Sequence, residues 1–132
     1  MLAGASDVFG QGYVTYAESA KMSLVGVKRE TLDKYGVVSG ETAAEMAEGG
    51  LCAADADMAL SVTGIAGPGG GTAKKPVGLC YIGCAYKSEN GMPEKYIKTV
   101  TEKHIFQGNR MQVREQAAAA AVALALKCLE AD

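Results

Sequence analysis

Tyr16 and Lys21 are the residues best suited to proton transfer, and they stand where an apolar segment gives way to a predicted helix. A lysine directly after a buried strand loses part of its hydration, which lowers its pKa and lets the neutral amine act as a base. A nearby tyrosine hydroxyl can relay the proton or donate to an oxyanion. A solvated lysine beside a core tyrosine would show the same spacing, and the spacing alone favours that alternative.

A glycine-rich segment, residues 64–76, is the second candidate for a site because it holds five glycines and two prolines. Successive glycines let backbone N–H groups approach an anion closely. The segment lacks the Gly-Lys-Ser/Thr of a Walker loop, and Gly10-Gln11-Gly12 lacks the third glycine of a dinucleotide fingerprint. Taken alone, each is more often a turn than a binding site. The composition of 64–76 predicts a loop, either ordered or mobile.

Regular elements surround these candidates. A buried strand is expected at 13–16, where β-branched and aromatic residues follow two glycines. Helices are expected at 17–24, 29–35 and 40–54, ended by Gly26 and by a left-handed cap at Gly36, and begun by an N-cap at Ser39. A strand buried on both faces is expected at 58–62, then a hairpin of 77–86 and 94–106 across Asn90-Gly91. Asn109 and Gln112 form a capping box for a long Ala-rich helix that continues through 113–128.

This order of elements predicts an α/β fold, a layered sandwich with a mixed β-sheet packed by helices. With 132 residues and 48% hydrophobic residues, the chain can bury one core, so a single domain over 1–132 is expected. The net charge of −2 provides no excess positive field for nucleic acid or an anionic membrane. No apolar stretch approaches the roughly 20 residues of a membrane span, and the N-terminus has no secretory pattern, so a cytoplasmic location is expected.

The four cysteines, Cys52, Cys80, Cys84 and Cys128, fall in predicted strands and helices. We therefore expect reduced, buried thiols that pack as small hydrophobic groups. His104 is distant in sequence from Cys80 and Cys84, and no second cysteine pair has zinc-ligand spacing, so neither a metal site nor another cofactor is predicted.

Several strings occur together in a characteristic order along the chain. They are Ser6-Asp7-Val8-Phe9, Val14-Thr15-Tyr16 with Ala20-Lys21, Gly26-Val27, Gly36-Val37-Val38-Ser39, Ser61-Val62-Thr63-Gly64-Ile65-Ala66-Gly67-Pro68, Lys75-Pro76-Val77-Gly78, and Phe106-Gln107-Gly108-Asn109-Arg110 with Val113-Arg114. Together they closely resemble the C-terminal domain of the CinA family. The resemblance runs across essentially the whole chain.

The resemblance implies an activity and roles for particular residues. Amidase members of the family hydrolyse the carboxamide of nicotinamide mononucleotide to nicotinate mononucleotide and ammonia, by a serine and lysine mechanism without metal. Lys21 matches the catalytic lysine and Tyr16 the tyrosine beside it. Thr63 and Arg110 match positions expected around the substrate, Gly64 opens the glycine-rich loop of the nucleotide pocket, and Arg114 is one turn beyond Arg110. A small-molecule nucleotide is therefore the expected partner.

The sequence departs from the family at the nucleophile. The family's serine lies in a Glu-Ser-Cys-Thr-Gly-Gly string upstream of the matched segment, and nothing like that string occurs here. Covalent acyl transfer needs a nucleophile as well as its activator. The chain is then either part of a longer product or a short form without catalysis, which would act as a nucleotide-binding or scaffolding domain. Apolar surface left uncovered by a missing first strand and helix would favour a homo-oligomer.

Overall fold

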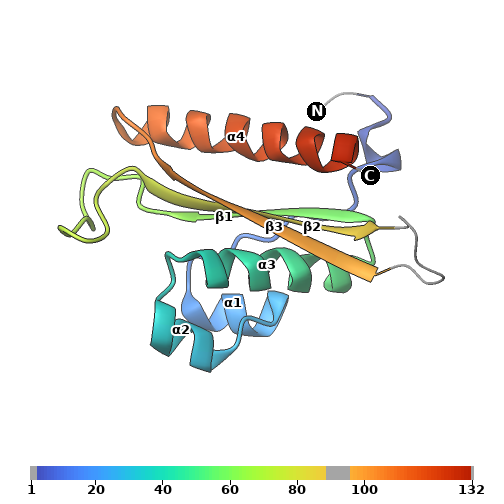
Figure 1. Cartoon of the computed structure of the whole chain (residues 1–132), viewed down its shortest axis with the longest axis horizontal. Helices are drawn as coiled ribbons and strands as arrows, with labels where there is room; N and C mark the ends of the chain where they lie inside the picture. The colour runs from blue at the N-terminus through green and yellow to red at the C-terminus, as the bar shows by residue number, and fades with distance from the viewer. Residues whose placement is uncertain (1–2, 89–95, 132) are drawn as a thin grey trace.

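The computed structural model of the chain describes residues 3–88 and 96–131 and arranges them in layers (Figure 1). A sheet lies in the middle, with the long helix α4 on one face and α3 on the other, and α1 and α2 pack on α3. The described elements in chain order are the 3-10 helix η1 (Ala5–Asp7), α1 (Glu18–Val25), α2 (Arg29–Tyr35), α3 (Gly40–Ala53), β1 (Met58–Gly64), β2 (Leu79–Ser88), β3 (Tyr96–Ile105) and α4 (Arg110–Ala131). The layered α/β fold expected from the sequence is confirmed.

The strand β2 is the centre of the sheet. It pairs antiparallel with β1 on one edge and with β3 on the other, so that Cys84 lies opposite both Leu60 and Val100. Eight of its ten residues are buried, which leaves no polar face for solvent. Such a strand must be covered on both sides, and α3 and α4 provide the two covers.

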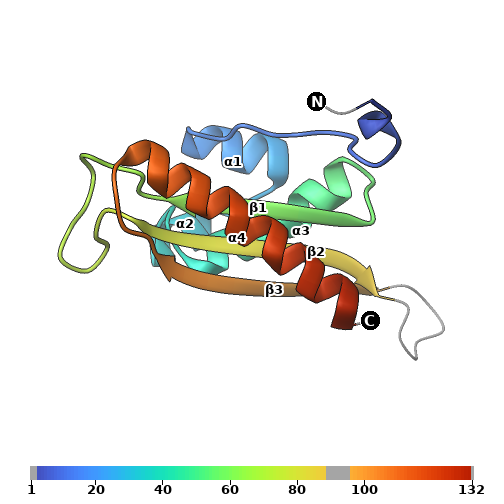
Figure 2. The ribbon, with the colours of Figure 1, turned by 90° about the horizontal axis from the view of Figure 1, so that it is seen from above.

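Helix α4 begins at the predicted capping box. The Asn109 amide donates to Gln112 Oε1 at 2.8 Å, and the Gln112 amide donates to Asn109 Oδ1 at 2.9 Å, so two donors are satisfied reciprocally. The helix then crosses the sheet obliquely (Figure 2). Its buried residues recur at helical spacing, and they pack on the β2 residues Ile82, Cys84 and Tyr86 and around Cys80. These buried residues are Val113, Ala117, Ala121, Leu124 and Cys128.

Helix α3 begins at Ser39, as predicted, and the Ser39 hydroxyl accepts a hydrogen bond from the Thr42 amide at 3.1 Å. Its sheet-facing side includes the small residues Ala43, Ala47 and Gly50, which bring the helix backbone close to the strands. A Cβ added at Gly83 of β2 would lie 2.7 Å from the Ala43 carbonyl oxygen. That carbonyl also accepts a hydrogen bond from the Ser61 hydroxyl of β1 at 2.6 Å. Helix α3 is therefore joined to the sheet by polar as well as apolar contacts.

Helices α1 and α2 are short and depend on α3 for their positions. Gly26 ends α1 in the left-handed conformation expected for a C-cap, with φ of 69°. Helix α2 has no capping side chain of its own, and Glu45 of α3 replaces one: its carboxylate accepts from the Lys28 amide at 2.9 Å and from the Thr31 hydroxyl. These contacts hold the beginning of α2, at Lys28 and Thr31, against α3.

Two expectations about the strands are wrong. The described strands form an antiparallel sheet instead of a mixed one, because 13–16 is extended but pairs with no strand, and Tyr13 packs instead on Val25, Val27 and Leu32. The strand at 58–62 is not buried on both faces either. Leu60 is 41% exposed and Val62 is 42% exposed, since α4 crosses the sheet obliquely and leaves part of β1 uncovered.

Smaller details also differ from expectation. Cys80, Cys84 and Cys128 are buried free thiols as expected, but Cys52, near the end of α3, is exposed. Gly36 follows α2 with a positive φ of 84°, yet its ψ of 170° is outside the left-handed helical region. The predicted turn at Asn90-Gly91 lies outside the described residues.

Two adjacent glycines of α3 provide a matched test of this packing. A Cβ at Gly49 would lie 1.5 Å from the Val25 carbonyl oxygen, whereas at Gly50 the nearest atom is the Ala59 Cβ at 4.0 Å. Gly49→Ala should therefore destabilise the fold by about 1–3 kcal/mol or more through overpacking. Gly50→Ala should be neutral or stabilise by about 0.5–1 kcal/mol because alanine favours the helix. Urea unfolding of both variants measures this, and equal effects would contradict the close contact between α1 and α3.

Candidate nucleotide-binding site

A cavity of about 630 Å³ lies between the glycine-rich loop and the beginning of α4. Loop residues 64–67, 69 and 70 form one wall, the first turns of α4 form another, and Val37 and Val38 close a third side. Most of the lining is apolar, including Val62, Cys80 and Val113, and Arg110 and Arg114 bring the charge. A concave, mainly apolar site with a few polar groups is the usual form of a small-molecule site.

Four of the residues predicted from the sequence meet at this cavity. Tyr16, Gly64, Arg110 and Arg114 all line it, although they come from the N-terminal segment, the end of β1 and the start of α4. Tyr16 is 84% exposed, so it is not the core tyrosine of the alternative interpretation. The other two predicted residues, Lys21 and Thr63, do not line the cavity.

Thr63 faces the opposite side of the sheet. Side chains alternate along a strand, so the neighbours Val62 and Gly64 reach the cavity while Thr63 turns toward α3. Its buried hydroxyl donates to the Val37 carbonyl oxygen at 2.6 Å. In this structure Thr63 therefore holds the cavity wall at Val37 in place and does not reach a ligand.

Lys21 is buried in α1, where its ammonium donates to the carbonyl oxygen of Thr15. Burial lowers the pKa of Lys21 below the ordinary lysine value, and the negative charge of Glu18 opposes this shift only in part. This is the direction expected from the sequence. A lysine with a lowered pKa gives up its proton more readily and can act as a general base.

The glycine-rich loop is held by its own hydrogen bonds. At its base, the Ile65 amide donates to Leu79 at 2.9 Å and the Gly78 amide donates to Ile65 at 2.7 Å. Gly67 has a φ of 85°, and a Cβ there would lie 2.5 Å from Val77 Cγ1, so only glycine fits this bend. Of the two interpretations, ordered or mobile, the structure supports the ordered loop.

Arg110 joins the loop to α4, since its Nη1 donates to the Gly67 carbonyl oxygen at 3.1 Å. The amides of Gln112 and Val113 are already bonded to Asn109. These two amides already have partners, and the side chains of Arg110 and Arg114 bring positive charge to this end of the cavity. Sequence reasoning missed the part of Val37 and Val38 in the cavity, because their position depends on the distant contact with Thr63.

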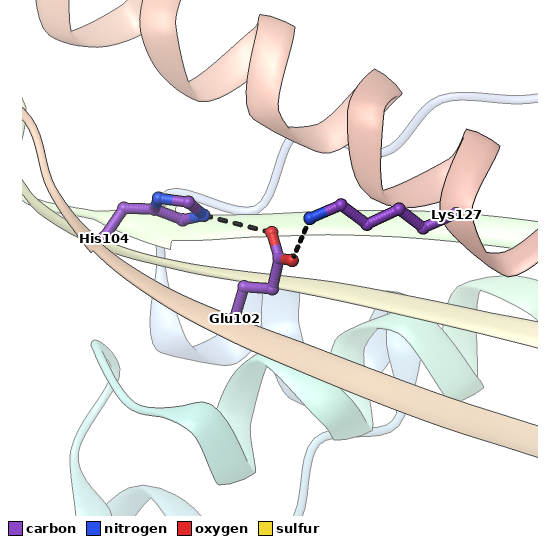
Figure 3. Close-up of polar contacts among 3 residues, drawn as sticks. All are labelled: Glu102, His104 and Lys127. Carbon is purple, nitrogen blue, oxygen red and sulfur yellow. Dashed lines mark hydrogen bonds and ion pairs between the residues drawn. The ribbon is translucent and has the colours of Figure 1, made fainter.

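A separate polar cluster lies between β3 and the last turns of α4 (Figure 3). Glu102 Oε1 is 3.1 Å from His104 Nε2, and Glu102 Oε2 accepts from Lys127 Nζ at 3.1 Å. The hydrogen bond with His104 and the contact with Lys127 lower the pKa of Glu102, against an opposing effect of burial. His104 also stacks on Phe106, with ring centroids 5.0 Å apart. The cluster ties β3 to α4 and shares no residue with the cavity.

The described part of the chain contains neither a cluster of metal ligands nor a helix that could span a membrane. No three His, Cys, Asp or Glu side chains gather there in a way that could hold a metal ion. Within the same residues, each helix is too short or too polar to cross a membrane.

The fold and the cavity together define a small layered α/β fold with a cavity between a glycine-rich loop and the beginning of α4. The chain belongs to the CinA C-terminal domain family, whose family model matches residues 1–129.

Relatives and solved structures agree with this family. A CinA-like protein of Endomicrobium trichonymphae is 51% identical over 113 residues, which is 86% of this chain and 24% of that protein. A CinA-like protein of Leptospira borgpetersenii is 49% identical over 115 residues, 87% of this chain and 26% of that protein. The chain thus spans about a quarter of the length of these curated relatives. The crystal structure of the competence/damage inducible protein CihA from Agrobacterium tumefaciens matches with a TM-score of 0.82 and 37% identity, covering 96% of this chain and 72% of that one.

The lowered pKa of Lys21 predicts a pH-dependent stability. Between the lowered pKa and the ordinary value of 10.5, the folded chain binds fewer protons than the unfolded chain. Rising pH therefore removes the cost of burying the charge, and the free energy of unfolding should rise more steeply with pH for the unaltered chain than for Lys21→Met. Urea unfolding at a series of pH values from neutral to about 10.5 measures the two slopes. Other titrating groups are common to both proteins, so parallel curves would show that the Lys21 pKa is not lowered.

Proposed function

We propose that this chain forms the nucleotide-binding part of an amidase of the CinA type, which hydrolyses nicotinamide mononucleotide to nicotinate mononucleotide and ammonia. The observation that carries the proposal is the cavity in which Arg110 and Arg114 face the glycine-rich loop, with Tyr16 at its margin. A nucleotide needs both a cationic region for its phosphate and an apolar region for its base. This cavity offers both.

The phosphate would bind the arginines. A guanidinium group has five N–H donors and pairs with a phosphate through two parallel hydrogen bonds. Arg110 has a single hydrogen bond in the described structure, from Nη1 to Gly67, so donors remain for an anion. The pyridine ring would pack on the apolar lining formed by Val62 and Val113.

The chemistry would use the lysine and the tyrosine. Lys21, with its lowered pKa, would take the proton of a nucleophile, and Tyr16 would relay it or donate to the developing oxyanion. The nucleophile would attack the carboxamide carbon, ammonia would leave with that proton, and water would then hydrolyse the acyl intermediate.

A non-catalytic nucleotide-binding or scaffolding role is the alternative, and two observations favour it. No serine is among the residues that line the cavity in the described structure. Ser39 caps α3, and Ser61 is bonded to Ala43, so both hydroxyls already have structural partners. The sequence also lacks the Glu-Ser-Cys-Thr-Gly-Gly string in which the family's serine lies.

Binding of the phosphate can be tested with two ligands. Arg110→Ala should weaken the binding of nicotinamide mononucleotide by about 1.5–3 kcal/mol, because it removes a charge-assisted hydrogen bond. It should affect the riboside, which has no phosphate, much less. Arg110→Lys should restore only part of the affinity, since an ammonium keeps the charge but not the planar fork. Calorimetric titration measures each affinity, and an equal loss for both ligands would refute the phosphate role.

Turnover provides the second test. The chain alone should release no ammonia from nicotinamide mononucleotide, and joining it to an upstream segment with the family's serine string should produce activity. In that extended protein Lys21→Met should lower the rate by at least about 10²–10⁴-fold, whereas Tyr16→Phe should be milder. Lys28→Met, at an exposed position, is the matched control. Ammonia release by the unextended chain, or near-full activity of Lys21→Met at neutral pH, would contradict the assignment.

A further inference from the structure

The glycine-rich loop is attached at a second point, through a residue other than Arg110. Lys75 Nζ donates to the carbonyl oxygen of Tyr35 at 2.9 Å, a contact between residues 40 positions apart in the sequence. Tyr35 is the last residue of α2, where helix carbonyls lack partners within the helix and a positive charge is favoured. The Lys75 side chain therefore joins the loop to the end of α2.

The chain is shaped to admit this lysine. A Cβ at Gly36 would lie 2.9 Å from Lys75 Nζ, closer than side-chain atoms normally approach, and Gly36 also has a positive φ of 84°. The backbone of Lys75 is fixed as well, because the Thr72 amide donates to its carbonyl oxygen at 2.8 Å and its own amide donates to the Thr72 hydroxyl at 3.0 Å. A closed turn thus presents the ammonium to Tyr35.

The contact between Lys75 and Tyr35 affects the cavity because the residues that follow Tyr35 line it. Val37 and Val38 form one wall of the cavity, and Gly69 and Gly70 of the loop form part of another. Lys75 joins the chain segments that carry these two walls, while Lys75 itself is absent from the cavity lining.

We propose that Lys75 is a positioning residue, which holds the glycine-rich loop against the end of α2 and thereby fixes the distance between the two walls of the cavity. The ordering of the loop is independent of any ligand. The effect on affinity rests on the proposed function, because it takes nicotinamide mononucleotide as the probe.

Hydrogen exchange of the free protein tests the attachment. In Lys75→Met the amides of Thr72 and Lys75's own position should exchange roughly 3- to 10-fold faster, as expected for the loss of one hydrogen bond that stabilises the closed loop. The amides of Ile65 and Gly78, at the base of the loop, should keep their rates and serve as an internal reference. Lys74→Met, which removes the same charge from the neighbouring exposed position, should change none of them.

A double-variant comparison separates the contact from general damage to the loop. Gly36→Ala should speed exchange of the Thr72 amide in the unaltered chain, because its Cβ displaces the ammonium, and should add little in the Lys75→Met background. Equal exchange in Lys75→Met and Lys74→Met would overturn the proposal, whatever the ligand results.

The affinities for nicotinamide mononucleotide and its riboside test whether Lys75 positions the walls of the cavity. Lys75→Met should weaken the nucleotide and the riboside by the same factor, because Lys75 acts on the walls and contacts no phosphate. A loss confined to the nucleotide would mean that Lys75 binds phosphate directly and would overturn the positioning role. If the unaltered chain bound neither ligand, the proposed function would fail, and the exchange rates alone would decide the role of Lys75.

Discussion

Both layers of helices depend on the burial of β2. The strand is hydrogen-bonded along both edges and covered on both faces, so neither α3 nor α4 could leave it without exposing apolar surface. Its small residues decide how closely the layers approach: Gly83 admits the backbone of α3, and Cys84 lies under α4. The beginning of the strand also builds the site, since Cys80 lines the cavity and Leu79 closes the base of the loop. The same strand thus fixes the core and one end of the cavity.

Hydrogen bonds fix the position of the helices relative to the strands, which apolar packing alone does not determine. The hydroxyls of Ser61 and Thr63 reach from β1 to carbonyl groups at Ala43 and Val37, and both contacts are at 2.6 Å. Each such bond adds only about 1 kcal/mol to stability, but a buried carbonyl left without a partner would cost more. These two hydrogen bonds therefore fix the position of α3 and of the segment before it relative to the sheet. Because that segment includes Val37, the shape of the cavity follows from a threonine that lies outside it.

The sequence predicted best those features that depend on neighbours in the chain. The Asn109–Gln112 capping box, the Ser39 N-cap and the end of α1 at Gly26 are local signals, and each was confirmed. Features that depend on distant partners were missed. The segment 13–16 has the composition of a strand but no partner among the described strands, and β1 is exposed where the oblique course of α4 leaves it. Thr63 was expected beside the ligand because the resemblance matched its position in the sequence. The alternation of side chains along β1 instead points it away from the cavity, toward Val37.

The two cations that hold the glycine-rich loop differ in what a ligand can do to them. Arg110 donates to Gly67 through Nη1, and both residues line the cavity, so an anion there would either share the guanidinium with Gly67, through its remaining donors, or displace Gly67 from it. A charge-assisted hydrogen bond to an anion is stronger than a hydrogen bond to a neutral carbonyl, so the anion would draw the guanidinium partly away from Gly67. Lys75 donates to a helix-end carbonyl, and neither Lys75 nor Tyr35 lines the cavity. If Arg110 turned toward a phosphate, the loop would lose one attachment and keep the other. The attachment through Lys75 would then keep the loop in place while Arg110 binds.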